Sequence, residues 1–274
     1  MLGKLFKYEF SATGRVFLPM YGALLVMSVI ARIFYTSNIR SDIATMLITM
    51  LLVMLFTAVW VVTLVIIVRR FWTNLLGREG YLMNVLPVNP WEHVLAKTVT
   101  SGVWIIAGTV VSVVAFLIML FGLPELADID LREFFADFDE FMAYLRDGNI
   151  TGQVVLIIVQ GVLLAVVSSF QFTLTAYASM CVGQLADSHR TLASIGAYFG
   201  LNTAQSLITS LANDVGYFKT VSMVPAGTEY AEYARRALVN TNQFMALFLL
   251  LSVVVCVAMF FVSSTLLKKK LNLQ

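Results

Sequence analysis

Charged side chains are scarce in this chain of 274 residues, of which 12% are Asp, Glu, Lys or Arg and 59% are hydrophobic. Globular proteins in water carry about 25% charged residues, so this composition excludes a soluble enzyme or binding domain. Only two cysteines occur, both within apolar runs, which excludes a disulfide framework. The mean hydropathy of +0.86 instead predicts a membrane protein.

Groups that would catalyse or energise a reaction are also missing. Ionisable residues within spans often mark proton relays, and the apolar runs hold none near their centres, with Arg32 at the outer end of the first. His93 and His189 have no neighbouring ligands at the spacing of a metal site, and no phosphate-binding loop of the G-x-x-x-x-G-K-[ST] type is present. We therefore expect no enzyme activity, metal or cofactor in this chain, and energy supplied by a partner. The net charge of +2 gives no indication of nucleic-acid binding.

Long apolar runs predict an all-α membrane protein, because about 20 apolar helical residues cross a bilayer core of about 30 Å. Membrane β-barrels instead show alternating segments of about ten residues. The predicted spans are 16–34, 43–68, 94–121, 153–182, 191–212 and 244–267. Lysines and arginines gather in the segments that share one side of this topology, so the positive-inside rule predicts cytoplasmic N- and C-termini.

Three further segments are predicted outside the spans. Residues 1–15 have one apolar face and separate lysines, which predicts a helix in the membrane interface with its lysines toward anionic lipid headgroups; a frayed cytoplasmic tail is the alternative. Residues 123–150 predict an acidic, amphipathic external helix, either a solvated lid or a funnel for cations or substrate. Residues 213–243 form a second external segment, with a short helix at 228–238.

Uncharged polar residues form one stripe along each of the fourth and fifth spans at helical spacing. The candidates for a translocation path are Gln160, Gln171, Asn202, Gln205, Ser206 and Thr209. The alternative is that these groups only hydrogen-bond between helices, at about 0.6–2 kcal/mol for each bond. On another face of the fifth span, Gly196, Gly200 and Ala204 repeat every four residues and predict close packing of another helix.

The cytoplasmic connection at 69–93 is unusually apolar and aromatic for a linker. It contains Glu79-Gly80-Tyr81-Leu82 and then Leu86-Pro87-Val88, with Lys97 beyond it. This pattern resembles the cytoplasmic coupling segment of ABC-2-type permeases, the membrane subunits of bacterial ABC transporters. Family members often have a second acid before the glutamate and a serine after the Pro-Val pair, where this chain has Arg78 and Asn89.

The resemblance implies the ABC-2 transmembrane-domain fold, with six transmembrane helices in a single domain covering 1–274. It also implies a coupling helix between spans two and three that docks on a separate ATPase subunit, which holds ATP and Mg. The residues expected to couple ATP hydrolysis to transport are Arg78, Glu79, Gly80, Tyr81, Leu82, Leu86 and Pro87.

By this resemblance, the chain is expected to be a permease that exports a peptide, drug or lipid-like substrate across the bacterial cytoplasmic membrane. Its partners would be the ATPase, a second permease chain, identical or paralogous, and membrane lipid. Two alternatives stay open. One is an ABC-type sensing or immunity complex for membrane-active peptides, and the other is a non-ABC six-span channel or scaffold. No residue identifies the substrate.

Overall fold

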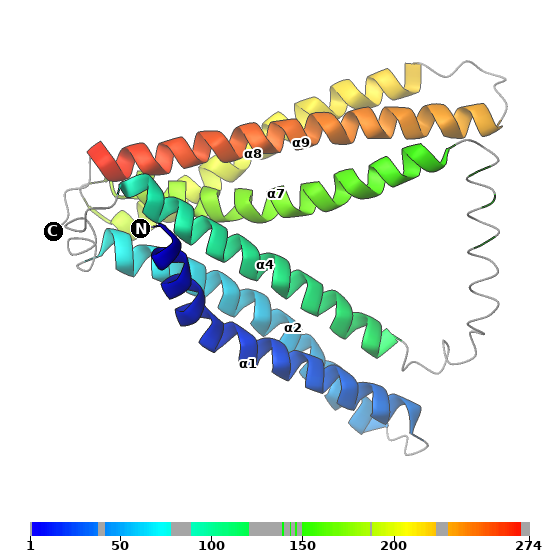
Figure 1. Cartoon of the computed structure of the whole chain (residues 1–274), viewed down its shortest axis with the longest axis horizontal. Helices are drawn as coiled ribbons and strands as arrows, with labels where there is room; N and C mark the ends of the chain where they lie inside the picture. The colour runs from blue at the N-terminus through cyan, green and yellow to red at the C-terminus, as the bar shows by residue number, and fades with distance from the viewer. Residues whose placement is uncertain are drawn as a thin grey trace. The chain divides into compact units, whose positions relative to one another are not determined.

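The computed structural model of this chain consists of long α-helices. It describes residues 2–37, 42–77, 89–120, 150–186, 188–222 and 230–269, together with Asp139, Ala143 and Arg146, and contains no strand within these residues. The elements are α1 (Leu2–Thr36), α2 (Asp42–Phe71), the π-helical turn η1 (Trp72–Leu76), α4 (Pro90–Leu120), α7 (Thr151–Gly183), α8 (Arg190–Ser222) and α9 (Tyr230–Lys269) (Figure 1).

Most of these helices suit a bilayer better than water. Within the described residues, α1, α2 with η1, α4, α7 and α9 are each long and apolar enough to cross a membrane. Their outer faces carry large apolar side chains; on α2, Ile43 is 74% exposed and Met46 is 72% exposed. Such surfaces are rare on soluble monomers, whereas lipid solvates them and the helices satisfy their own backbone hydrogen bonds. The other long helix, α8, is not among these five.

The helices form two compact units, one of α1, α2, η1 and α4 and one of α7, α8 and α9. In the first unit, one face of α1 is buried at alternating spacings of four and three residues. Its members are Phe17, Tyr21, Leu24, Ser28 and Ala31. This is the spacing of a helix that packs along a neighbouring helix. The face forms one core with Leu52 and Val59 of α2 and Ala115 of α4.

Trp104 of α4 joins α1 to α4 through its ring, its indole N–H and its backbone carbonyl. Its ring stacks on Phe17 with centroids 4.9 Å apart, and its indole N–H donates a hydrogen bond of 2.7 Å to the Thr13 hydroxyl. The Tyr21 hydroxyl donates a hydrogen bond of 2.7 Å to the Trp104 carbonyl. Gly108, one turn along α4, leaves room for this tyrosine, since a Cβ there would lie 2.9 Å from the hydroxyl oxygen.

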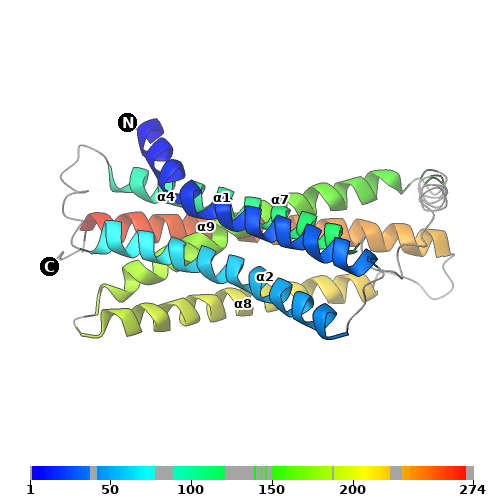
Figure 2. The same cartoon turned by 90° about the horizontal axis from the view of Figure 1, so that it is seen from below.

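Residues 2–15, expected as a separate interfacial helix, are instead the first turns of α1. These turns leave the axis of the rest of the helix at an angle (Figure 2). Two features of α1 favour bending. Pro19 lacks the N–H that would bond to the preceding turn, and the Thr13 hydroxyl bonds back to the carbonyls of Glu9 and Phe10.

In the second unit, α9 is longer than the span predicted from the sequence. It begins at Tyr230, so most of the short external helix expected at 228–238 is continuous with the last span, in one helix of 40 residues. At the other end of this unit, α7 meets α8 at a close contact. A Cβ on Gly183 of α7 would lie 2.5 Å from the backbone N and Cα of Ser194 on α8. A larger residue at this position therefore requires one of the two helices to move.

We expect Gly183→Ala to lower the free energy of unfolding by about 2 kcal/mol, because the methyl group must push α7 and α8 apart. The matched control is Gly161→Ala on the same helix, where nothing lies within 4 Å of an added Cβ. Thermal unfolding of the two purified variants in detergent measures the difference. Equal midpoints would mean that the contact at Ser194 does not hold the two helices.

Candidate functional site

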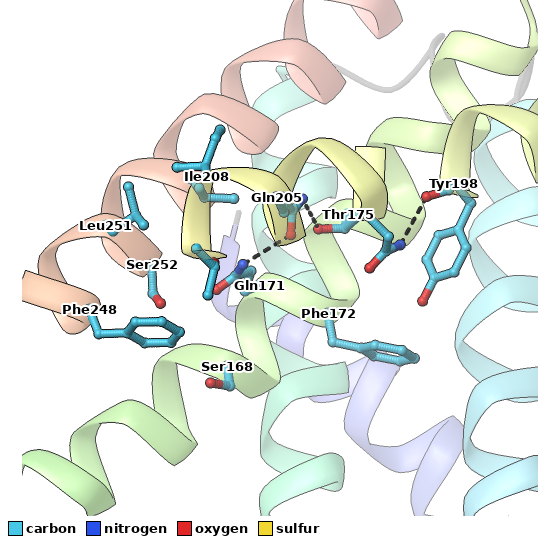
Figure 3. Close-up of a pocket in the computed structure, with 13 residues that line it drawn as sticks. Ser168, Gln171, Phe172, Thr175, Tyr198, Gln205, Ile208, Phe248, Leu251 and Ser252 are labelled. Carbon is cyan, nitrogen blue, oxygen red and sulfur yellow. Dashed lines mark hydrogen bonds between the residues drawn. The ribbon is translucent and has the colours of Figure 1, made fainter. Parts of the chain in front are cut away.

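Side chains of α7, α8 and α9 line a cavity of about 280 Å³ in the second unit. Its polar lining consists of hydroxyl and amide groups, among them Ser168, Gln171, Thr175, Asn202, Gln205 and Ser252. Its apolar lining includes Phe172 of α7 and Phe248 of α9 (Figure 3). None of the lining residues is charged. The cavity thus offers neutral hydrogen-bonding partners beside aromatic surface, a combination typical of sites for small or extended ligands.

A chain of hydrogen bonds crosses from α7 to α8 at the wall of this cavity. Gln171 donates from Nε2 to Oε1 of Gln205 over 3.0 Å, and Gln205 donates from Nε2 to the Thr175 hydroxyl over 3.1 Å (Figure 3). Asn202 donates to the carbonyl of Tyr198 on its own helix over 2.9 Å. These bonds fix the directions of three amide groups, and two of those amides bridge the helices.

Both interpretations of the polar stripes therefore have support. The glutamines bond between helices, as the packing alternative requires, and the same side chains border a cavity, as a path requires. Four of the predicted path residues line this cavity: Gln171, Asn202, Gln205 and Thr209. Ser206 is exposed and is not among the lining residues.

Gln160, the remaining predicted path residue, belongs to a separate polar contact between α7 and α9. It donates to the backbone carbonyl of Asn242 over 3.2 Å. The Asn242 side chain, in a residue that is 5% exposed, donates in turn to the side-chain oxygen of Gln153 over 2.6 Å. Along α7, Gln160 and Gln171 are roughly 16 Å apart at 1.5 Å for each residue. Gln160 is therefore an interhelical link away from the cavity.

The face of small residues on α8 makes no close contact within the described part of the chain. An added Cβ at Gly196 or at Gly200 would meet nothing within 4 Å, and Ala204 is exposed. The close contact between α7 and α8 lies instead at Gly183. Close packing of another helix against Gly196, Gly200 and Ala204 stays a prediction.

A largely buried group of three charged residues in the first unit, Glu9, Arg70 and Lys97, was not predicted from the sequence. Glu9 of α1 accepts from Lys97 of α4 over 2.7 Å and from Arg70 of α2 over 3.0 Å, one contact on each carboxylate oxygen. The Lys97 side chain is 5% exposed and that of Glu9 is 13% exposed. We call these three residues the ionic cluster. It joins α1, α2 and α4, and the one available signal was that Glu9 is the single acid among the first 15 residues.

The predicted coupling residues lie, along the chain, between two helices that the ionic cluster joins. The structure describes the chain up to Gly77, after the π-helical turn η1, and again from Asn89. The residues between these limits lie outside the described residues, and they include Arg78, Glu79, Gly80, Tyr81, Leu82, Leu86 and Pro87. The acidic segment 123–150 also lies outside them, apart from Asp139, Ala143, Arg146 and Ile150.

The apolar helices and their outward-facing apolar side chains define the class of this chain, which is a helical, multi-pass membrane protein. Comparison with protein-family models, with curated proteins and with solved structures found no match.

We expect Gln205→Ala to lower the free energy of unfolding by about 1 kcal/mol, because it removes both bonds of the chain between α7 and α8. Ser206→Ala is the matched control, since Ser206 is the next residue on the same helix and is exposed. The comparison is made by thermal unfolding in detergent. If the two variants unfold alike, the bonded amides contribute nothing to holding α8 on α7.

Proposed function

We propose that the chain is the permease subunit of an ATP-driven ABC transporter of the ABC-2 type. It exports a peptide, drug or lipid-like substrate across the bacterial cytoplasmic membrane, with both termini in the cytoplasm. A separate ATPase subunit supplies the energy, and a second permease chain, identical or paralogous, completes the assembly. The observation that carries this proposal is the polar, uncharged cavity that α7, α8 and α9 line.

The cavity supports transport because polar groups are expensive among lipid-facing helices unless they bond to each other or to a substrate or water. Three helices of this unit each contribute such groups to the cavity: Gln171 from α7, Asn202 from α8 and Ser252 from α9. The bond from Gln171 to Gln205 and the bond from Asn202 to Tyr198 use only part of the hydrogen-bonding capacity of these two amides. A transported molecule can use the rest.

The six-span topology requires α8 to cross the membrane in addition to the five apolar helices. Its 33 residues extend about 50 Å at 1.5 Å for each residue, more than the bilayer core of about 30 Å. Three of its polar residues, Asn202, Gln205 and Thr209, line the cavity and so need not contact lipid. With six spans, the two termini lie on the same side of the membrane.

Coupling to an ATPase is supported by the sequence between Arg78 and Trp91 and by the helices that flank it. Arg70 lies near the end of α2, and Lys97 lies on the second turn of α4. Both bond to Glu9, so a displacement of the segment between them would move α1, α2 and α4 together. Rigid-body movement of packed helices is the usual means by which such a displacement is transmitted.

Affinity purification of the full chain from its native membrane tests the proposal. We expect an ATPase with a phosphate-binding loop to co-purify in mild detergent, and the assembly to hydrolyse ATP. A channel or scaffold would be isolated without one. Isolation of the intact chain with no ATPase, from cells in which it is functional, would overturn the assignment.

A further inference from the structure

The amide groups of the cavity have hydrogen-bonding capacity that the described residues do not use. A primary amide carries two N–H donors and one carbonyl acceptor. Gln171 donates to Gln205, and Asn202 donates to its own helix. Within the described part of the chain, the side-chain oxygens of Gln171 and Asn202 accept no hydrogen bond. Among the described residues, each of these two amides therefore keeps one acceptor and one N–H without a partner.

Spare donors and acceptors on neighbouring helices select for particular ligand chemistry. A peptide group carries one donor and one acceptor. It can therefore donate to the oxygen of a side-chain amide and accept from the N–H of a side-chain amide. An ester, as in the backbone of a glycerolipid, carries only acceptors and would leave the two amide oxygens without donors. A charged group has no counter-ion here, because no lining residue is charged, and burial of an unpaired charge is strongly unfavourable.

The apolar walls and the volume of the cavity indicate the apolar part and the size of the ligand. Phe172, Ile208, Phe248 and Leu251 supply apolar and aromatic surface. The volume of about 280 Å³ is just below the roughly 300–1,000 Å³ of sites that enclose a drug-sized molecule. A volume of this size suits a small molecule or a short part of a longer one.

We propose that this cavity binds an uncharged, amide-bearing apolar segment, such as one or two apolar residues of a peptide. The inference rests on the proposed function, because it names the substrate class of the same path. Gln171 and Asn202 bond to the amide groups, and Phe172 and Phe248 contact the apolar side chains.

Protection of an introduced thiol tests this proposal on the purified full chain, without any ATPase. Ser168, an exposed residue of the cavity lining, is changed to Cys while Cys181 and Cys256 are replaced by Ala. The probes are N-acetyl-leucyl-leucine N-methylamide, its analogue with an ester in place of each of the three amides, and zwitterionic leucyl-leucine. The rate of maleimide labelling is measured with each probe.

We expect the amide probe, at about ten times its dissociation constant, to slow labelling about tenfold, since only the free site reacts. At the same concentration the ester should protect several-fold less, although it partitions better into detergent, and the zwitterion should not protect. Protection by the ester equal to that by the amide, or no protection by any probe, would overturn the proposal.

A second variant links the protection to the proposed residues. Adding Gln171→Leu and Asn202→Leu should abolish the preference for the amide over the ester, with a normal melting profile as the check on folding. Retention of the preference in a folded variant would contradict the assignment of these two residues. The outcome is independent of ATPase co-purification, so failure of one experiment is distinguishable from failure of the other.

Discussion

Glu9→Gln is expected to lower the free energy of unfolding by about 3 kcal/mol. The substitution removes the negative charge that Lys97 and Arg70 share. The Lys97 side chain is 5% exposed, so its charge would remain buried next to a second cation after the carboxylate is lost. Removal of one partner from a buried ion pair typically costs about 3–5 kcal/mol. Thermal unfolding in detergent measures the loss.

Two further variants separate the charge from other effects of the substitution. Glu92→Gln, on the first turn of α4, removes an acid for which the described residues show no ion pair, and should change stability by about 0.5 kcal/mol or less. In the double variant Glu9→Gln with Lys97→Met, the buried cation is gone, so stability should recover partly. A double variant less stable than the sum of its single changes would contradict the cluster's role.

Glu79→Ala and Gly80→Pro are expected to abolish coupled transport while the protein still inserts and assembles. Both changes fall in the segment that resembles a coupling helix, where a proline would restrict the backbone at a position that glycine leaves free. ATP hydrolysis by the assembly should persist or become independent of substrate, while export stops. Export and ATP turnover are measured together in proteoliposomes that contain the purified assembly.

Glu92→Ala is the control for these variants, since Glu92, on the first turn of α4, is not one of the residues that carry the resemblance. It should retain export. Normal export by both Glu79→Ala and Gly80→Pro would remove the coupling assignment, and loss of insertion in both would show a structural role for the segment.

The existence of the long helices follows from the composition of the chain. The places where one helix ends or continues into the next segment do not. The fourth span was predicted at 153–182, and α7 covers Thr151–Gly183, because an unbroken apolar run has few other structures in a membrane. By contrast, the change from an amphipathic to an apolar pattern near residue 15 does not determine whether the helix breaks. In the structure the helix is continuous through this point, and Thr13 and Phe17 on either side of it both contact Trp104 of α4.

The cavity was predictable in part, because helical periodicity gives the direction of a side chain but neither its depth nor its neighbour. Periodicity grouped Gln171 with Gln160, yet the two belong to different contacts along α7. The contribution of Ser252 and Phe248 from α9 had no signal in the stripes of the fourth and fifth spans. The ionic cluster is a similar case, since three charges from three segments can be paired only when the helices are placed.

If the proposed function is correct, nucleotide on a partner ATPase changes the access of water to the cavity of this chain. In a background without Cys181 and Cys256, Gln171→Cys and Asn202→Cys are labelled with a membrane-impermeant thiol reagent, which reacts with the thiolate in water. Leu163→Cys, on an exposed apolar part of α7, serves as the lipid-facing control. We predict that labelling at both cavity positions changes when nucleotide is added to the purified assembly, while Leu163→Cys stays inert. Complete inertness of both cavity positions in every nucleotide state would contradict the claim and leave the amides as interhelical links alone.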